Sequence, residues 1–160
     1  MPRSDRTDRR IVELLQENAR RSNKEIASAV GIASSTCSER LRRLEDDGVF
    51  RGFYADVDSE WLGIGLGAMV AIRLRRHEAR EVALFWEHAL AMPEVIGVSH
   101  LTGVNDFLVH VVVRDADHLR ELAVSGFTTL PEVAHIETSL IFEHVSKHSL
   151  PDYRGPGDGE

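Results

Sequence analysis

Apolar residues recur every three or four positions through the first 47 residues, which is the period of amphipathic α-helices. Ile11, Leu14 and Leu15 form the first such stripe and predict a helix over residues 7–18. Side-chain oxygens near its start can accept hydrogen bonds from the free N–H groups of the first turn. The candidate caps are Asp5, Thr7 and Asp8.

Residues 22–44 have the pattern of two short helices joined by a tight turn. Gly31 can adopt the positive φ angle of such a turn without steric cost, and Ala27 is small enough for two helices to cross closely. The apolar positions are Ile26, Ala27 and Val30, followed by Ile32, Cys37, Leu41 and Leu44. The pattern predicts a DNA-reading helix-turn-helix, with an ordinary helical hairpin as the alternative.

The outward face of the second of these helices carries hydroxyl groups near its start and guanidinium groups towards its end. These groups suit base edges and phosphates. Asn23 is a further candidate phosphate contact, although it could equally cap its helix together with Ser22. Arg40 could equally pack within the domain. The candidate DNA-binding residues are Asn23, Ser34, Ser35, Thr36, Ser38, Arg40, Arg42 and Arg43.

The third helix is expected to stop at Asp47 and Gly48, because glycine commonly follows the last helical turn. An extended apolar run begins at Val49 and Phe50, and we expect a strand and a hinge over residues 50–62. Three helices with a polar, basic third helix predict a helix-turn-helix domain, winged or plain.

The second half of the chain alternates between the two-residue period of strands and the longer period of helices. Pro93 and Pro131 each end a helix just before a strand. The predicted elements are strand 66–75, helix 78–91, strands 95–101 and 107–113, a helix near 119–130, and strand 134–142. The β-α-β-β-α-β order is ferredoxin-like, so we expect an α+β chain with one antiparallel sheet and both helices on one face.

The second set of side chains on these strands is also partly apolar. A sheet that is apolar on both faces needs a partner for the face that the helices leave open. The apolar residues of that face include Met69, Ala71, Leu108, Val112, Ile141 and Val145. We therefore expect a homodimer through the sheets, which would present two reading helices to two half-sites of double-stranded DNA.

Charge divides the chain into the same two parts. Residues 1–54 contain 11 Lys or Arg and 9 Asp or Glu, whereas residues 55–160 contain 8 and 17, in a chain of net charge −7. Nucleic-acid contact should therefore be confined to the amino-terminal part. The single cysteine, Cys37, permits no internal disulfide. No segment approaches the ~20 apolar residues of a membrane span, and MPRSDRTDRR does not read as a signal peptide. We expect a cytoplasmic protein with no membrane partner.

The loop between the second and third predicted strands, TGVND, offers groups that suit a zwitterion. Backbone amides around Gly103 can meet a carboxylate, and Asp106 can meet an ammonium group. A plain hairpin turn, in which Asn105 and Asp106 bond to their own backbone, is the alternative. The candidate effector-binding residues are Thr102, Gly103, Val104, Asn105 and Asp106, with Thr128, Thr129, Thr138 and Ser139 as additions.

This order of features resembles the Lrp/AsnC family of bacterial and archaeal transcription regulators, the feast/famine regulatory proteins. The resemblance covers about residues 7–148 and is dense in SNKEIASAVGIASSTCSERLRRLEDDGVFRGFYADVD and in LTGVNDFLVHV. It implies an amino-terminal DNA-binding domain and a carboxy-terminal domain that binds an effector, usually a free amino acid. It also implies dimers that assemble further, often to octamers, with the effector pocket between dimers.

The resulting domain prediction is a helix-turn-helix domain over residues 1–50, a linker strand and hinge over 51–64, an effector-binding and oligomerisation domain over 65–148, and a disordered tail over 149–160. One position departs from the family pattern. The family usually has Ser or Thr as the cap of the recognition helix, where this chain has Ala33. Ser34 or Ser35 would then cap instead and shift the helix start by one residue.

The expected function is a sequence-specific DNA-binding transcriptional regulator, modulated by a small effector such as an amino acid. Siroheme decarboxylases share the two-domain plan, but of their His-Asn-Tyr, Arg and Trp only His100 is present here. No nucleophile, base and orienting group can be placed together, so we expect no enzyme. An effector-independent architectural DNA-binding protein is the second alternative. The eight histidines are scattered, so we expect no metal and no cofactor.

Overall fold

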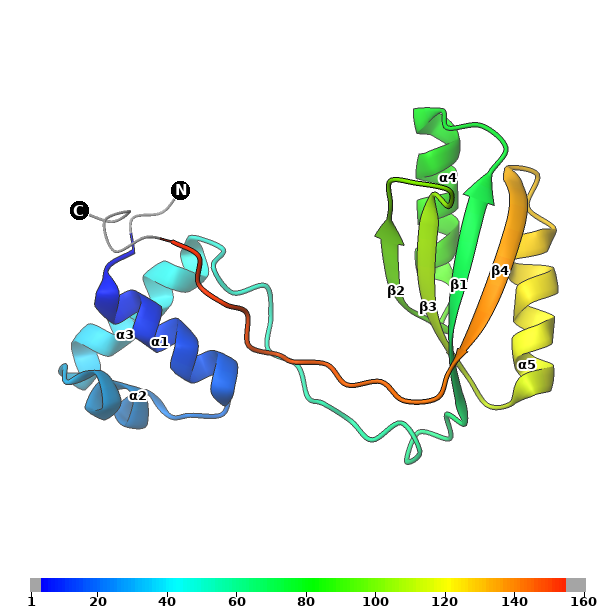
Figure 1. The fold of residues 1–160 in the computed structure, drawn as a ribbon. Coiled ribbons are helices and arrows are strands. Elements are labelled where there is room, and N and C mark those ends of the chain that lie inside the picture. The colour runs from blue at the N-terminus through cyan, green and yellow to red at the C-terminus, as the bar shows by residue number, and fades with distance from the viewer. Residues whose placement is uncertain (1–3, 155–160) are drawn as a thin grey trace. The chain divides into compact units, whose positions relative to one another are not determined.

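The computed structural model describes residues 4–154 and divides the chain into two compact units (Figure 1). Of the described residues, the helical unit comprises those up to Ala55 and those from Val145 to Arg154. The sheet unit comprises Asp56–His144, so it ends four residues before the expected boundary at 148. No helix among the described residues is long and apolar enough to cross a lipid bilayer.

The helical unit contains three helices, α1 (Arg6–Glu17), α2 (Asn23–Val30) and α3 (Ser34–Asp46). At α1, the Asp8 N–H donates to the Asp5 carboxylate at 2.9 Å, and the Asp5 N–H donates to the Asp8 carboxylate at 3.1 Å. Ser22 and Glu25 form the same reciprocal arrangement at the start of α2. Both helices therefore begin with a capping box, which satisfies N–H groups that have no partner within the helix.

The turn between α2 and α3 forms as the sequence predicts, but its cap differs. Gly31 has a φ of 73°, in the left-handed region that a glycine adopts without strain. Ala33 then occupies the N-cap position of α3 in extended conformation, without a side-chain cap. The expectation that Ser34 or Ser35 would cap this helix is wrong, because the turn places both serines inside the first helical turn.

The core of the helical unit lies between the three helices. Its buried residues are those of the predicted stripes: Ile11, Leu14, Leu15, Ile26, Ala27, Cys37 and Leu44. Gly48 ends α3 with a φ of 68°, as predicted, and Phe50 packs on the core. The expected strand over 50–62 is absent from the described chain, where residues 51–58 have no regular structure. A strand needs a hydrogen-bonding neighbour, and no described segment pairs with these residues.

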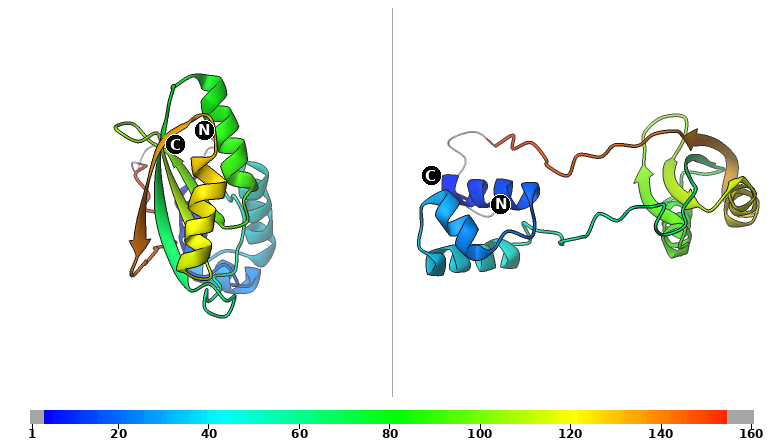
Figure 2. Two further views of the ribbon diagram at one scale, coloured as in Figure 1. Left: turned by 90° about the vertical axis from the view of Figure 1, so that its right-hand side faces the viewer. Right: turned by 90° about the horizontal axis from the view of Figure 1, so that it is seen from below.

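The sheet unit has the predicted β-α-β-β-α-β order. Its strands are β1 (Leu66–Leu74), β2 (Val95–His100), β3 (Phe107–Val113) and β4 (Val133–Ile141). They pair antiparallel in the order β2-β3-β1-β4. The helices α4 (Ala79–Ala91) and α5 (Ala116–Glu121) lie on the same side of this sheet (Figure 2). The prediction of a ferredoxin-like α+β domain is confirmed.

The second helix of the sheet unit differs from the single helix predicted near 119–130. After α5 the chain continues as a π-helical segment, η1 (Leu122–Thr128). There the Thr128 hydroxyl donates at 2.9 Å to the carbonyl of Ala123, five residues earlier. The Thr129 hydroxyl donates to the carbonyl of Ser125 at 2.9 Å. Both bonds satisfy carbonyls of this segment, and the Thr128 bond has the five-residue spacing of a π-helix, which the apolar pattern alone does not reveal.

The two faces of the sheet differ in how fully they are covered. The helix-covered face contains fully buried side chains such as Val70 and Val109, which lie opposite each other in the β1–β3 register. On the open face, Ala71 lies opposite Leu108, and Gly67 lies between Val112 and Ile141. These apolar side chains of the open face are only half-buried in the single chain, as the sequence pattern predicts.

The described end of the chain lies against α1. The Leu150 N–H donates to the Gln16 side chain at 2.6 Å, and Arg154 donates to the Ser4 hydroxyl at 2.7 Å. Hydrogen bonds from Arg154 lower the pKa of Asp152 to about 2. The sequence predicts a disordered tail over 149–160, of which residues 155–160 lie outside the described part of the chain.

Candidate DNA interface and effector loop

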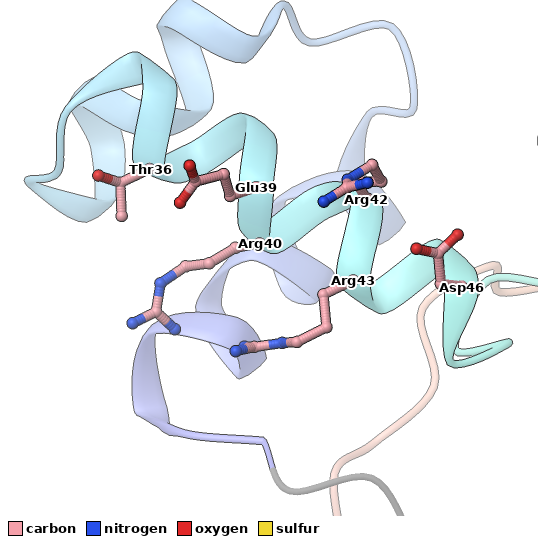
Figure 3. Close-up of a pocket in the computed structure, with 6 residues that line it drawn as sticks. All are labelled: Thr36, Glu39, Arg40, Arg42, Arg43 and Asp46. Carbon is pink, nitrogen blue, oxygen red and sulfur yellow. The ribbon is translucent and has the colours of Figure 1, made fainter.

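A surface hollow on α3 gathers the charged side chains that the sequence points to. It is lined by Thr36, Glu39, Arg40, Arg42, Arg43 and Asp46 (Figure 3). Four of these residues were predicted to bind DNA, and the helical period places them together on one side of the recognition helix. The hollow is open to solvent and contains charges of both signs.

Two of the three arginines of this hollow are held by carboxylates of α1. Arg40 donates to Asp5 at 2.7 Å and to Asp8 at 2.8 Å, and Arg43 donates to Asp8 at 2.6 Å. The Asp8 side chain is only 1% exposed. Hydrogen bonds to Asp8 and then to Asp5 raise the pKa of the Arg40 guanidinium. Arg40 therefore packs within the domain, which was the alternative to its role as a phosphate contact.

Asn23 and Ser38 join α2 to α3. The Asn23 amide donates to the carbonyl of Ser34 at 3.0 Å and to the Ser38 hydroxyl. The Ser38 hydroxyl in turn donates to the Ser34 carbonyl at 3.1 Å. Asn23 is therefore not a cap, because Ser22 forms its capping box with Glu25 instead. The Asn23 NH2 group and the Ser38 hydroxyl therefore help to fix the crossing of the two helices.

The other half of the predicted DNA-binding set is open. These side chains are exposed and form no hydrogen bond or ion pair within residues 4–154: Ser34, Ser35, Thr36 and Arg42. Arg20 and Lys24 are also exposed, and their side chains have no partner in the same range. These two residues flank the start of α2. The sequence-based prediction did not include them, although they lie on either side of the predicted contact Asn23.

The predicted effector loop between β2 and β3 is exposed except at its end. Thr102, Gly103 and Val104 face solvent and Asn105 is half-buried, whereas Asp106 is only 7% exposed. One Asp106 carboxylate oxygen accepts the N–H of Leu74 at 2.7 Å, and the other contacts Nδ1 of His77 at 2.6 Å. Asp106 therefore anchors the loop to the end of β1, and its carboxylate is already occupied within the chain.

The remaining effector candidates do not gather around this loop in one chain. Thr128 and Thr129 use their hydroxyls within η1. Thr138 lies opposite Val70, whereas Ser139 lies opposite Met69, so these neighbours point to opposite faces of β4. The loop follows β2 and these residues belong to or precede β4, and the two strands are the opposite edges of the sheet. Among the described residues, no three His, Cys, Asp or Glu side chains could hold a metal ion.

Comparison with known proteins gives two family matches and close relatives. Residues 4–51 match the family of winged helix-turn-helix DNA-binding domains, and residues 67–151 match the Lrp/AsnC ligand binding domain. The transcriptional regulator AldR of Mycolicibacterium smegmatis is 43% identical over 141 residues, which are 88% of this chain and 82% of AldR. The transcriptional activator DecR of Escherichia coli K12 is 33% identical over 148 residues, which are 92% of this chain and 97% of DecR.

Solved structures of transcriptional regulators also resemble this chain over most of its length. A transcriptional regulator from Neisseria meningitidis, determined as a complex with L-Met, has a TM-score of 0.86 and 28% identity. The match covers 92% of this chain and 96% of that one. The crystal structure of MtbAldR has a TM-score of 0.73 and 34% identity, over 92% of this chain and all of the other.

Proposed function

Because the chain belongs to the Lrp/AsnC family of DNA-binding transcription regulators, we propose that it reads operator DNA with the open side chains of α3. The protein is an effector-modulated regulator: one unit is a helix-turn-helix, and the other is an Lrp/AsnC ligand-binding domain. The reading residues in this proposal are Ser34, Ser35, Thr36 and Arg42, with Arg20 and Lys24 as phosphate contacts. The observation that supports them is their exposure without a partner inside the described chain.

The proposed effector is a free amino acid bound at the loop of residues 102–105. The complex of the Neisseria relative with L-Met supports this ligand class. Backbone N–H groups around the exposed Gly103 suit the carboxylate of such a ligand. The ammonium group would need another partner than Asp106, whose two oxygens are occupied. Since the candidate residues lie at opposite edges of one sheet, we propose that a second copy of the chain completes the pocket.

Assembly is part of this proposal. The half-buried apolar side chains of the open sheet face would be covered by the same face of a second copy, giving a homodimer. Association of dimers, up to an octamer, would bring further chains to the effector loop. We place this assembly in the cytoplasm, where its DNA and free amino acids are both available. No enzymatic role is proposed.

The experiment is genomic footprinting of the protein on its own chromosome, followed by titration of the recovered fragment with and without each of the twenty amino acids. We expect discrete protected sites whose affinity or footprint changes with one or a few amino acids. Protection that is uniform and indifferent to all twenty would instead support the architectural alternative. Isothermal titration of the protein alone supplies the matched control, because it reports effector binding without DNA.

A further inference from the structure

Two carboxylates of the described chain are buried, Asp8 and Asp106. Asp8 is the more buried of the two, and it faces the recognition helix. Its side chain is 1% exposed, whereas Arg40 and Arg43 are 24% and 49% exposed. Figure 3 shows both guanidinium groups extending from α3 towards α1. Each guanidinium therefore reaches the surface hollow on one side and a buried or capping carboxylate on the other.

The sum of charges around this hollow is unusual for a DNA-binding surface. The lining contains three arginines against Glu39 and Asp46. When Asp5 and Asp8 are included, four carboxylates outnumber the three guanidiniums by one. Sequence-independent DNA affinity comes from cations that neutralise phosphates and release counterions. Two of the three cations of this helix are already neutralised by α1, so little charge remains for that purpose.

We propose that Asp8, assisted by Asp5, masks Arg40 and Arg43 and so limits the affinity of α3 for DNA of arbitrary sequence. Asp8 is thus a positioning residue that sets specificity: it orients two guanidiniums away from phosphate, whereas Arg42 of the same helix has no partner within residues 4–154. Phosphate contacts carry affinity but no sequence information, so masking them raises the share of binding that depends on bases. This inference rests on the proposed DNA reading by α3.

The test uses the full-length protein, a short mixed-sequence duplex, and fluorescence anisotropy between about 50 and 200 mM salt. Asp8→Asn keeps the side-chain shape but removes the masking charge. We expect tighter binding to this duplex and a plot of log K against log salt that is steeper by about one charge. Asp46→Asn is the matched control, since it removes one charge from the same hollow but forms no ion pair among the described residues.

The masking role is overturned if Asp8→Asn has the slope of the wild type or of Asp46→Asn. A merely structural Asp8 would lower the thermal midpoint without changing the slope. If Asp8→Asn does not fold, Arg42→Gln and Arg43→Gln provide the second comparison. We expect Arg42→Gln to reduce the slope by about one charge and Arg43→Gln to leave it unchanged, and equal reductions would reject the masking. Wild-type protein that binds neither this duplex nor genomic fragments would reject the proposed function itself.

Discussion

The recognition helix α3 and the loop of residues 102–106 are the two surfaces that the sequence assigns to ligands, and they are built alike. In α3, Arg40 and Arg43 turn inward to Asp8, while the small hydroxyl side chains near the start of the helix remain open. In the loop, Asp106 turns inward to Leu74 and His77, while Thr102, Gly103 and Val104 face the solvent. In both places a buried carboxylate is tied to partners inside the chain, and smaller groups nearby face the solvent.

The comparison has a physical basis. A buried charge is tolerated only when other groups compensate it, so a carboxylate near a core is tied to specific partners. The two surfaces differ in what those partners are. Asp8 ties together two helices through arginines, whereas Asp106 ties a loop to a strand through a backbone N–H and an imidazole. A charged residue in a candidate site can therefore be the support of that site rather than its ligand contact.

The largest expected change in stability comes from removing the Asp106 carboxylate, which holds the loop to the end of β1. Asp106→Ala leaves the Leu74 N–H buried without its acceptor, and we expect the free energy of unfolding of the sheet unit to fall by about 2–3 kcal/mol. Urea denaturation followed by tryptophan fluorescence reports this unit, because both tryptophans lie in it. Asp117→Ala is the control, since Asp117 is 86% exposed. A loss below about 0.5 kcal/mol would show that Asp106 is free to bind a ligand.

A slightly smaller effect is expected in the helical unit. Arg40→Ala removes one of the two guanidiniums that compensate Asp8, and we expect that unit to lose about 2 kcal/mol of stability. Arg42→Ala, on the same helix, should cost less than about 0.5 kcal/mol because it has no partner in the described chain. Amide hydrogen exchange of α1 and α3 measures both changes. An equal loss of stability in the two variants would contradict the distinction between an arginine that supports the fold and one that is open to the solvent.

A gain is expected at the uncapped start of α3. Ala33→Ser should stabilise the helical unit by about 1 kcal/mol, because position 33 has the extended conformation of an N-cap but no side-chain acceptor. The melting temperature followed by far-ultraviolet circular dichroism is the measurement. Ala29→Ser, an exposed helical position nearby, should instead be neutral or slightly destabilising. An unchanged melting temperature for Ala33→Ser would mean that the helix does not begin at Ser34.

The smallest effect concerns His110 on the open sheet face. Burial, with His144 as a second cause, lowers the pKa of His110 below its ordinary value of 6.5. The unfolded chain then takes up a proton at higher pH than the folded one, so the stability of the sheet unit should fall as the pH drops through about 6.5. His110→Gln should weaken this dependence, as judged from urea midpoints at several pH values. A wild-type midpoint that rises on acidification would contradict this sign.

Much of the fold follows from apolar spacing, because helices and tight turns are defined by residues that are close in the sequence. Gly31, Gly48 and the alternating strands define elements through local geometry, and these predictions are confirmed. The strand expected over 50–62 is wrong, because a strand depends on a neighbour that a local pattern cannot supply. The cap at Ser34 or Ser35 is wrong because the length of the turn after Gly31 decides which residue becomes the N-cap.

The structural roles of Asp8 and Asp106 could not be predicted from the sequence, for a related reason. Asp8 lies 32 residues from Arg40, and Asp106 lies 29 residues from His77, so no sequence motif contains either pair. Residue type alone indicated that Arg40, Arg43 and Asp106 belonged to the two surfaces, but not which way they face. Only the packing of α1 on α3, and of the loop on the end of β1, separates supporting residues from open ones.

The most direct test of this division compares two hydroxyl residues of α3 on the genomic fragment that the protein protects. Thr36 is open, whereas Ser38 bonds to Ser34 and Asn23. Thr36→Val should weaken binding to this fragment about five-fold, the equivalent of roughly 1 kcal/mol, at an unchanged melting temperature. Ser38→Ala should lower the melting temperature but keep the ratio of specific to mixed-sequence affinity. The opposite pattern, with discrimination lost in Ser38→Ala and intact in Thr36→Val, would contradict the account.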